Sequence, residues 1–427
     1  MLSVAIFALL AGLFWFGLNQ RQRNQPLELQ ALLTILISVG LLCRLAFVFF
    51  TPAFYAPDEV SHYKYVQYLA EQHAFPVQTS KVGDPTNDFE YNQPPLYYLL
   101  LTPLFVAANA AFHSTAATVI CLRLVSVLCW GCNVWLAKLW LRRLEVKDSF
   151  VCVFVMGMVC LLPTYVFVSA AINNDNLLAT LGGALLYLLA RREQTLKRSL
   201  VTGFLLGLAL LAKQSAVVFV FAIAVLAAFD GIQQRLKWST VLLQLGAVLG
   251  VATLVFLPRA LWNFKVYGTF TPEFLVVTRI PWPSFLHGMV SAGHNLLKSF
   301  WAVSGITNNI GYPFPLPGML LMALCVVAQQ DGIHRARLGD DQKLGPSDAM
   351  MTALLVAVLV NIGLVLRFGY QFGMGQGRHL FSVLFPIALV LAWGLRPLPI
   401  KYPAVQAAGF WVAYAVIFTV FSLHRFP

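Results

Sequence analysis

The stretch TPAFYAPDEVSHYKYVQYLAEQHAFPVQTSKVGDPTNDFEYNQPPLYYL, residues 51–99, is the long polar interval among the first apolar runs of this 427-residue chain. It contains six of the 17 acidic residues. The segment Pro57-Asp58-Glu59 predicts the start of a helix, because proline suits the first helical position and carboxylates in the first turn favour the exposed N–H groups there. On such a helix Asp58 and His62 share one face and Glu59 lies on another. What these side chains do depends on where a membrane places them.

The composition of the chain predicts an all-α protein that crosses a membrane many times. Hydrophobic residues make up 59% and charged residues 11%, with a mean hydropathy of +0.74, whereas soluble domains average about 25% charged residues. The net charge of +12 is spread over short loops, without a basic block beside stacking aromatics, which argues against a nucleic-acid partner. The seven cysteines fall within apolar runs, where a thiol acts as a small hydrophobe. We expect a single transmembrane domain over residues 1–427.

The hydropathy pattern predicts about twelve spans, each near the length that a bilayer requires. The pair 199–212 and 215–229 is short and is interrupted at Lys213. The apolar segment 94–112 is ambiguous, since a crossing there would move every later loop to the other side of the membrane. The candidate spans are 2–18, 28–50, 116–141, 150–172, 176–191, 199–212, 215–229, 239–257, 313–330, 349–367, 379–395 and 403–423.

The distribution of positive charge resolves this ambiguity. If 94–112 does not cross, most of the 29 Lys and Arg residues gather on one side, as the positive-inside rule requires. A crossing would instead put the pairs Arg142-Arg143 and Arg191-Arg192 outside. We therefore predict that both termini face out. A first long outer loop, residues 51–115, would carry membrane-parallel helices, and a second outer loop would cover residues 258–312.

This topology brings acidic residues together on the outer side. Asp58, Glu59 and His62 lie there, and so does Asp175 within the run Asn173-Asn174-Asp175-Asn176. An acid at bilayer depth is costly and usually functional. The alternative is structural, because both acidic segments can cap the helix that follows and compensate its dipole.

Three basic sites suggest how an anionic ligand could be held. Lys213, between two half-length spans, needs an anionic partner, either a carboxylate or a ligand phosphate, unless it snorkels to the headgroups. Arg123 lies inside its span and is a second candidate for phosphate contact, with pairing to a structural carboxylate as the alternative. In the segment 373–379 the glycines permit close backbone approach to a ligand, the N–H groups of a new helix can bind phosphate, and Arg378 is a bidentate donor. A simple packing turn is the alternative for these glycines.

Taken in order, these motifs resemble the GT-C class of integral-membrane glycosyltransferases. Within that class they are similar to a bacterial family of membrane proteins related to the protein mannosyltransferases and the lipid A aminoarabinose transferases. The resemblance extends from about residue 50 to residue 390. It rests on Pro57-Asp58-Glu59 with His62, Gln93-Pro94-Pro95-Leu96-Tyr97-Tyr98, Arg123 with Ser126, Asn173-Asn174-Asp175-Asn176, the break at Lys213, Ser299 with Trp301, and Gly375 to His379.

The resemblance implies an inverting transfer of a sugar from a polyprenyl-phosphate carrier to a glycan, lipid or protein acceptor. The site would face the periplasm or exterior of a bacterial inner (plasma) membrane. Asp58 would be the general base, Asp175 the second acidic position, and Lys213 with Arg378 would lie near the carrier phosphate. The catalytic candidates are thus Asp58, Glu59 and Asp175, and the candidate substrate contacts are His62, Asn92, Gln93, Arg123, Asn173, Asn176, Lys213, Arg259, Arg378 and His379.

No cofactor is expected, because a carrier phosphate is a good leaving group once cations stabilise its charge, and the chain contains no nucleotide-binding motif. A divalent metal held by two carboxylates and a histidine is a less favoured alternative. A secondary transporter or lipid flippase is the competing function. Transporters, however, place ionisable groups near the midplane between paired repeats, whereas here the groups gather at one face. A non-catalytic assembly partner of a polysaccharide exporter is a third hypothesis.

Overall fold

The structure, a computed structural model, describes residues 29–79, 89–190, 195–233, 235–272, 280–305, 311–336, 348–373, 375–398 and 400–427. These residues form helices joined by loops, and no β-strand occurs among them. The all-α prediction is therefore confirmed. The first apolar run, 2–18, lies outside the described residues.

Each predicted span from residue 28 onward coincides with a helix or with a pair of successive helices. The helices are α2 (Leu29–Phe50), α3 (Glu59–Gln72), α4 (Leu96–Phe112), α5 (Thr115–Arg143), α6 (Ser149–Leu161), α7 (Pro163–Val168), α8 (Asp175–Leu189), α9 (Leu196–Ala212), α10 (Val218–Ile232), α11 (Trp238–Tyr267), α12 (Phe285–Trp301), α13 (Leu316–Ala336), α14 (Asp348–Phe372), α15 (Leu384–Leu395) and α16 (Pro403–Arg425), with the 3-10 helices η1 (Gln214–Val217) and η2 (Gly377–Val383).

Seven helical segments in the described part of the chain are long and apolar enough to cross a membrane. They are α2, α5, η1 with α10, α11, α14 from Ala349, η2 with α15, and α16, and shorter apolar helices include α4, α6 and α8. Within a bilayer such segments are helical because every backbone polar group must be satisfied internally. The protein is therefore an integral membrane protein, and the total of about twelve spans stays a prediction.

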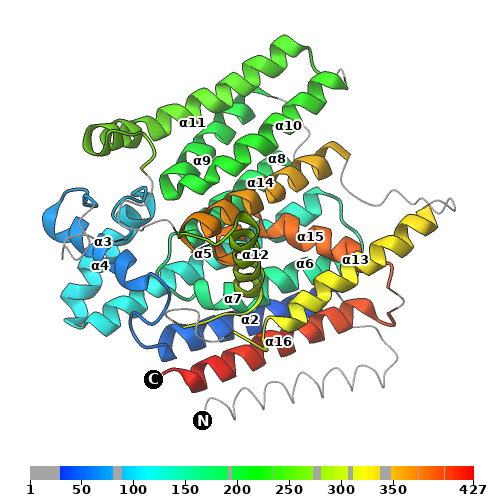
Figure 1. The fold of residues 1–427 in the computed structure, drawn as a ribbon, viewed down its shortest axis with the longest axis horizontal. Coiled ribbons are helices and arrows are strands. Elements are labelled where there is room, and N and C mark those ends of the chain that lie inside the picture. The colour runs from blue at the N-terminus through cyan, green and yellow to red at the C-terminus, as the bar shows by residue number, and fades with distance from the viewer. Residues whose placement is uncertain are drawn as a thin grey trace.

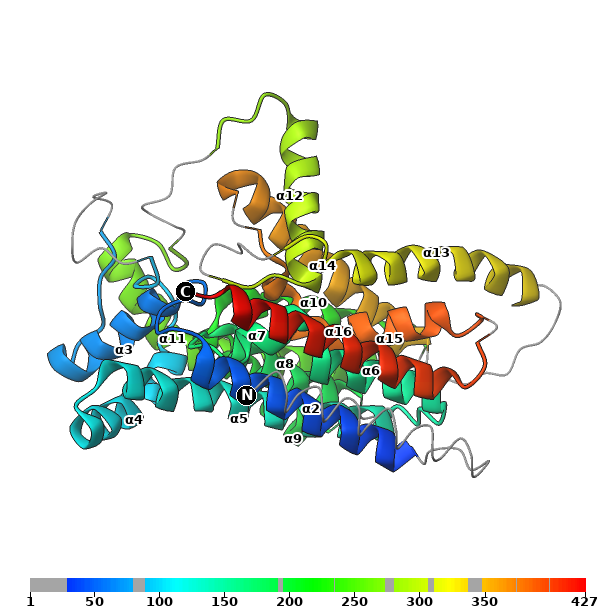
Figure 2. The same cartoon turned by 90° about the horizontal axis from the view of Figure 1, so that it is seen from below.

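The long helices lie alongside one another in a bundle, and α3 and α4 lie together at one end of it (Figures 1 and 2). Arg123, in the third turn of α5, donates hydrogen bonds to the carbonyl oxygens of Val48 (3.1 Å) and Thr51 (2.7 Å). The start of α5 therefore lies against the end of α2. The chain between them, α4 included, leaves and re-enters the bundle at the same end, which we call the α3–α4 end.

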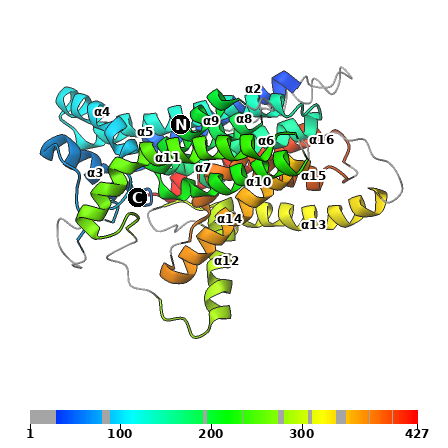
Figure 3. The same cartoon turned by 90° about the horizontal axis from the view of Figure 1, so that it is seen from above.

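Helix α12 runs in a different direction from the rest of the bundle. It stands across the long helices and projects away from them at its N-terminal end (Figures 2 and 3). The described residues of the predicted outer loop 258–312 therefore contain two helical parts, the last turns of α11 and the whole of α12. Helix α11 continues through Pro258 to Tyr267, and Gly268 then ends it in the left-handed conformation (φ 70°) that glycine adopts without steric cost.

Two helix boundaries differ from the sequence-based expectation. The predicted helix at Pro57 begins at Glu59 instead, because Asp58 adopts the left-handed conformation (φ 59°) and cannot continue a right-handed helix. The predicted span 150–172 is divided into α6 and α7 at Leu162, and Pro163 occupies the first position of the new helix. Because proline has no backbone N–H, it cannot donate the hydrogen bond that would continue α6.

Candidate active site

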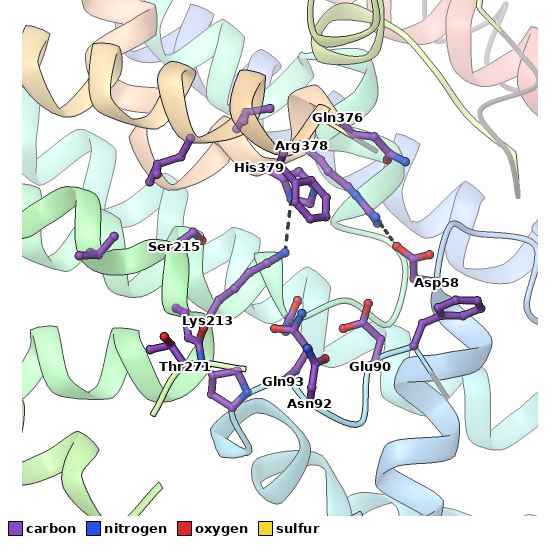
Figure 4. A pocket seen from close by; sticks show the side chains of 18 of the residues that line it. Asp58, Glu90, Asn92, Gln93, Lys213, Ser215, Thr271, Gln376, Arg378 and His379 are labelled. Carbon is purple, nitrogen blue, oxygen red and sulfur yellow. Dashed lines mark hydrogen bonds and ion pairs between the residues drawn. The ribbon is translucent and has the colours of Figure 1, made fainter. Parts of the chain in front are cut away.

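A cavity of about 610 Å³ opens at the α3–α4 end of the bundle, a size typical of small-molecule sites. One part of its wall is apolar and includes Phe256 of α11 with Leu364 and Phe368 of α14. The rest is polar, and Figure 4 shows these side chains converging on the cavity from several helices. The polar lining includes Asp58, His62, Glu90, Asn92, Gln93, Asn173, Asn174, Lys213, Gln376, Arg378 and His379.

Asp58 faces this cavity because of its backbone conformation. The left-handed geometry turns its side chain away from the N-terminus of α3, to which it makes no capping hydrogen bond. Its carboxylate instead accepts a hydrogen bond from Arg378 Nη2 (Figure 4). Burial raises the pKa of Asp58, but the charge and the hydrogen bond of Arg378 outweigh that effect and lower the pKa to about 2. The carboxylate is therefore ionised at neutral pH.

A second ion pair lies beside the first. Lys213 directly follows the last residue of α9, and its extended backbone (φ −162°) directs its side chain toward the start of α8. Its Nζ donates to Asp175 Oδ1 at 2.6 Å and lies 3.4 Å from His379 Nδ1. Arg378 Nε is 4.0 Å from Asp175 Oδ2. The structure thus places Arg378 between the two acids, so that charges far apart in the sequence form one cluster.

The asparagines around Asp175 mainly shape the backbone. Asn173 Oδ1 accepts a hydrogen bond from the Asp175 N–H (2.8 Å). Asn176 Nδ2 donates to the carbonyl oxygens of Val168 (3.0 Å) and Ala171 (3.3 Å). Asn173 lines the cavity, whereas Asn176 does not. The predicted substrate contact at Asn176 is therefore not supported by its position.

Glu59 and Arg123 lie outside the cavity and form a buried pair with each other. Arg123 donates from Nε to Glu59 Oε1 (2.8 Å) and from Nη2 to Glu59 Oε2 (2.6 Å), and both side chains are almost fully excluded from solvent. The sequence placed Glu59 among the catalytic candidates and Arg123 among the phosphate contacts. Their geometry favours the structural alternative for both residues, because the pair joins α3 to α5 and neither side chain lines the cavity.

Arg259 likewise has a structural role, because it holds a backbone segment in place. It donates from Nη2 to the carbonyl oxygens of Asn92 (3.1 Å) and Gln93 (3.0 Å), and its guanidinium lies 4.2 Å from the ring centroid of Trp262. It does not line the cavity. Arg259 therefore holds in place the segment that presents Asn92 and Gln93 to the cavity, and its predicted contact with substrate is not supported.

The glycine-rich turn before Arg378 serves packing. The Gly377 N–H donates to Ser299 Oγ (2.8 Å), and a Cβ at Gly377 would lie 2.2 Å from the Cα of Phe300. The predicted phosphate contact by this backbone N–H is therefore not supported, since that group already bonds Ser299. The close approach of α12 nevertheless positions the next two side chains, Arg378 and His379, in the cavity.

This contact predicts a strong effect of Gly377→Ala. The added methyl group would meet backbone atoms rather than a flexible side chain, so we expect a loss of stability of about 1–3 kcal/mol or more, measured by thermal unfolding in detergent. Gly363→Ala in α14 is the matched control, because a Cβ there meets nothing within 4 Å and alanine favours a helix by up to about 1 kcal/mol. Equal stability of the two variants would contradict the packing role.

Glu90 is a cavity residue that the sequence motifs did not single out. Its Oε2 lies 4.0 Å from His62 Nδ1, which is also 3.0 Å from the Tyr98 hydroxyl. Tyr97 and Tyr98 of the Pro-Pro-Leu-Tyr-Tyr block support the site from behind, and the Tyr97 hydroxyl accepts the Asn173 N–H (3.0 Å). The only available signal for Glu90 was its closeness to that block in the sequence. Glu90 lies in a loop, so no helical periodicity predicts the direction of its side chain.

No group of three or more His, Cys, Asp or Glu side chains within the described ranges has an arrangement that could hold a metal ion. The expectation that the site works without a cofactor stays a prediction.

Comparison with known protein families gives a match over part of the chain. The family model described as dolichyl-phosphate-mannose-protein mannosyltransferase matches residues 94–262, from the segment before α4 to the last turns of α11. No curated protein sequence matches the chain.

Solved structures of similar fold include two of the oligosaccharyltransferase of Archaeoglobus fulgidus. The complex with an inhibitory peptide and a dolichol-phosphate has a TM-score of 0.53 and 13% identity, covering 91% of this chain and 55% of that one. The complex with Zn and sulfate has a TM-score of 0.51 and 12% identity, covering 90% and 53%. A structure of ArnT from Cupriavidus metallidurans bound to undecaprenyl phosphate has a TM-score of 0.41 and 14% identity, covering 91% and 77%.

These comparisons confirm the resemblance to the GT-C class that the sequence motifs predicted. The fold is that of membrane glycosyltransferases, and the family whose model matches is also one of glycosyltransferases. The chain spans about half the length of the archaeal proteins with which it shares this fold.

Proposed function

We propose that this protein is a membrane glycosyltransferase that moves a sugar from a polyprenyl-phosphate carrier to an acceptor at the outer face of the membrane, with inversion at the sugar carbon. The observation that carries the proposal is the cavity in which Asp58, Lys213 and Arg378 meet beside an apolar wall. Two comparisons support it. The matching family model is named for a dolichyl-phosphate sugar, and a protein of similar fold holds a dolichol-phosphate.

The cations of the cavity are suited to a carrier phosphate. Arg378 Nε and Nη1 are buried and have no hydrogen-bond partner among the described residues, so a phosphate oxygen would satisfy them. Lys213 adds a second positive charge close by. Preorganised cations stabilise the negative charge that develops on a phosphate leaving group. The apolar wall formed by Phe256, Leu364 and Phe368 offers the adjoining isoprenyl chain a surface to bury.

Asp58 would act as the general base. The acceptor hydroxyl oxygen attacks the anomeric carbon, the bond to the phosphate oxygen breaks, and the hydroxyl proton passes to the Asp58 carboxylate. While Arg378 is bonded to Asp58, its low pKa makes it a weak base. A bound phosphate would draw the guanidinium toward itself, which removes the main cause of that low pKa. Asp58 would thus become a stronger base when the donor is in place.

The role of Lys213 gives a prediction for donor binding. Lys213→Gln removes one of the cations that line the cavity, and we expect the Kd of a polyprenyl-phosphate sugar to rise about 10–100-fold, or about 1.4–3 kcal/mol, as measured by isothermal titration calorimetry. Lys265→Gln is the matched control, because Lys265 is exposed near the end of α11 and should bind like the wild type. A monodisperse elution profile would show that the variant is folded. An unchanged Kd would remove Lys213 from the phosphate site.

The proposal is tested directly with the purified full-length protein in lipid nanodiscs. A panel of polyprenyl-phosphate sugars is supplied with candidate glycan, lipid and protein acceptors, and both donor binding and release of the polyprenyl phosphate are measured. We expect at least one donor to bind and to be consumed. Failure to bind or consume any donor of a broad panel would overturn the proposal.

We also propose that the α3–α4 end faces the periplasm of a bacterial inner membrane, since the positive-inside rule places the basic hairpins on the opposite side. A cysteine introduced at Gln72, exposed at the end of α3, should react with an impermeant maleimide in intact spheroplasts. Reaction only after lysis would reverse the orientation.

The competing hypothesis of a transporter or flippase is not favoured by the position of the site. The charged cluster lies beside α3 and the segment before α4, since Asp58, His62 and Glu90 line the cavity, whereas transporters place coupled ionisable groups near the midplane between repeats. Accumulation of a substrate in sealed proteoliposomes would support transport instead.

A further inference from the structure

Helix α12 presents an exposed apolar stripe that the proposed reaction does not use. Val290 follows Leu286 by four positions and Leu297 follows it by eleven, so the three side chains lie along one side of the helix. The exposed fractions of Leu286, Val290 and Leu297 are 71%, 63% and 40%. Helix α12 does not line the cavity. The partner of this stripe is therefore not a ligand held in the cavity.

The helix has two other sides, and their residues differ from the stripe in character. Gly288 lies on the side that packs against α14, since a Cβ there would be 2.7 Å from the ring of Tyr370. His287, His294 and Lys298 lie on the third side, each one position after a place in the same helical series as the stripe. The helix contains no Asp or Glu. Away from its contact with the bundle, α12 is thus apolar along one side and basic along another.

Helix α12 lies at the level where two membrane-spanning segments meet. Of the segments that are long and apolar enough to cross a membrane, one ends with α14 at Phe372 and the next begins with η2 at Gly377. The last turn of α12 is joined to this point, because Ser299 Oγ accepts the Gly377 N–H at 2.8 Å. The ends of spanning helices lie near the boundary between the hydrocarbon region and the headgroups. The structure therefore places α12 at that boundary.

The direction of the helix agrees with this level. Because α12 stands across the long helices (Figures 2 and 3), its axis is parallel to the membrane plane. Trp301, four residues after Leu297, packs on Gly318 in the first turn of α13, which is a predicted span. Lys298 of the basic side lies instead against the segment before α13, with its Nζ 5.9 Å from the ring centroid of Tyr312. The apolar stripe thus faces the side on which α13 enters the bilayer.

We propose that α12 is an interfacial helix that lies in the membrane plane and buries Leu286, Val290 and Leu297 among the acyl chains of the leaflet at the α3–α4 end. Amphipathic helices of this kind insert their apolar side about 5–10 Å into the boundary between headgroups and acyl chains, with basic residues toward the phosphates. The anchor uses no residue of the cavity and does not depend on the proposed reaction. Because α12 holds Gly377, it would also fix the depth in the membrane of the neighbouring Arg378.

The test places the photoreactive residue p-benzoylphenylalanine at single positions of the full-length protein in nanodiscs of phosphatidylethanolamine and phosphatidylglycerol. On irradiation the benzophenone group inserts into a nearby C–H bond, and mass spectrometry of the intact protein detects a covalent phospholipid adduct. Leu254, which is 67% exposed on the spanning helix α11, is the positive control. We expect adducts from positions 286 and 290 in a yield within about threefold of that from position 254, since all three would contact acyl chains.

His287 is the matched control within the same helix. It is exposed and adjacent to Leu286, but it lies on the basic side, so we expect its adduct yield to be at least about fivefold lower. The bulky residue should be tolerated at positions 286, 287 and 290, because each side chain is exposed, and a monodisperse elution profile checks that each variant is folded. Two stripe positions are used so that the loss of one variant leaves the other to decide.

Three results would overturn the interfacial role of α12. The first is the absence of phospholipid adducts at positions 286 and 290 while position 254 gives one. The second is an equal yield at positions 286 and 287, because a helix outside the membrane plane would not present one side to the acyl chains. The third comes from irradiation of intact cells, where a protein adduct in place of the phospholipid adduct would assign the stripe to a protein partner.

Discussion

Asp58→Asn is expected to lower kcat for sugar transfer by about 10³-fold, because general-base catalysis contributes about 10²–10⁴-fold and an amide cannot accept the acceptor proton. The Kd of the donor should change much less, since Lys213 and Arg378 remain. The measurement is a comparison of wild type and variant in two assays, donor binding by calorimetry and release of the polyprenyl phosphate under saturating donor and acceptor.

The variant should fold normally, which keeps this experiment interpretable. About a third of the Asp58 side chain is exposed, and it makes no capping hydrogen bond to α3. Arg378 also keeps a second carboxylate, Asp175, at 4.0 Å, so replacing Asp58 by a near-isosteric amide does not leave this guanidinium without a counter-charge. An unaltered melting temperature is the control. Full turnover in Asp58→Asn would exclude this residue as the base, and full function of the variant in cells would favour the hypothesis of a non-catalytic assembly partner.

Replacement of the neighbouring acid, Glu59, should lower the stability of the protein, whereas replacement of Asp58 lowers turnover. Glu59 accepts hydrogen bonds from two nitrogens of Arg123 and from the N–H groups of Phe54 (3.0 Å) and Ile172 (3.1 Å). Glu59→Gln would leave the buried Arg123 guanidinium without its counter-charge, and breaking a buried pair in this way costs about 3–5 kcal/mol. We expect that loss in the free energy of unfolding, measured by denaturant titration of the protein in detergent micelles.

An exposed ion pair is the natural comparison. Arg396 Nε lies 2.8 Å from Asp148 Oδ2 with both side chains partly exposed to solvent, and Arg396→Gln should cost less than about 1 kcal/mol. Combining Glu59→Gln with Arg123→Met should recover part of the stability lost in the single variant, because no uncompensated charge then remains buried. A loss of under about 1 kcal/mol for Glu59→Gln alone would show that the pair does not stabilise the fold.

These two predictions show how far a helical pattern can predict the roles of adjacent residues. The spacing of Asp58, Glu59 and His62 predicted that Asp58 and His62 share a direction and that Glu59 points elsewhere. The structure agrees with this division, since only Asp58 and His62 of the three line the cavity. The pattern could not show that the Glu59 side chain is buried against Arg123, because that contact depends on how α3 packs on α5.

Lys213 is a site residue that the sequence could single out, and Glu90 is one that it could not. The break at Lys213 was visible because two short apolar runs flank it, and the backbone does change direction there. The partner of Lys213 remained open between a carboxylate and a ligand phosphate, and the structure supplies Asp175. Glu90 carried no such signal, since it lies in a loop whose direction is determined by contacts elsewhere, including those of Arg259 with the 92–93 carbonyls.

The sequence by itself determined the positions of the membrane helices and of the polar intervals between them. This is a local property, because an apolar run of about 20 residues in a bilayer has to satisfy its backbone internally and therefore forms a helix. Only the tertiary structure decided which charges meet. Asp58 and Arg378 are 320 residues apart, and their contact depends on the packing of α12 against Gly377 and on the left-handed backbone at Asp58, neither of which a local pattern encodes.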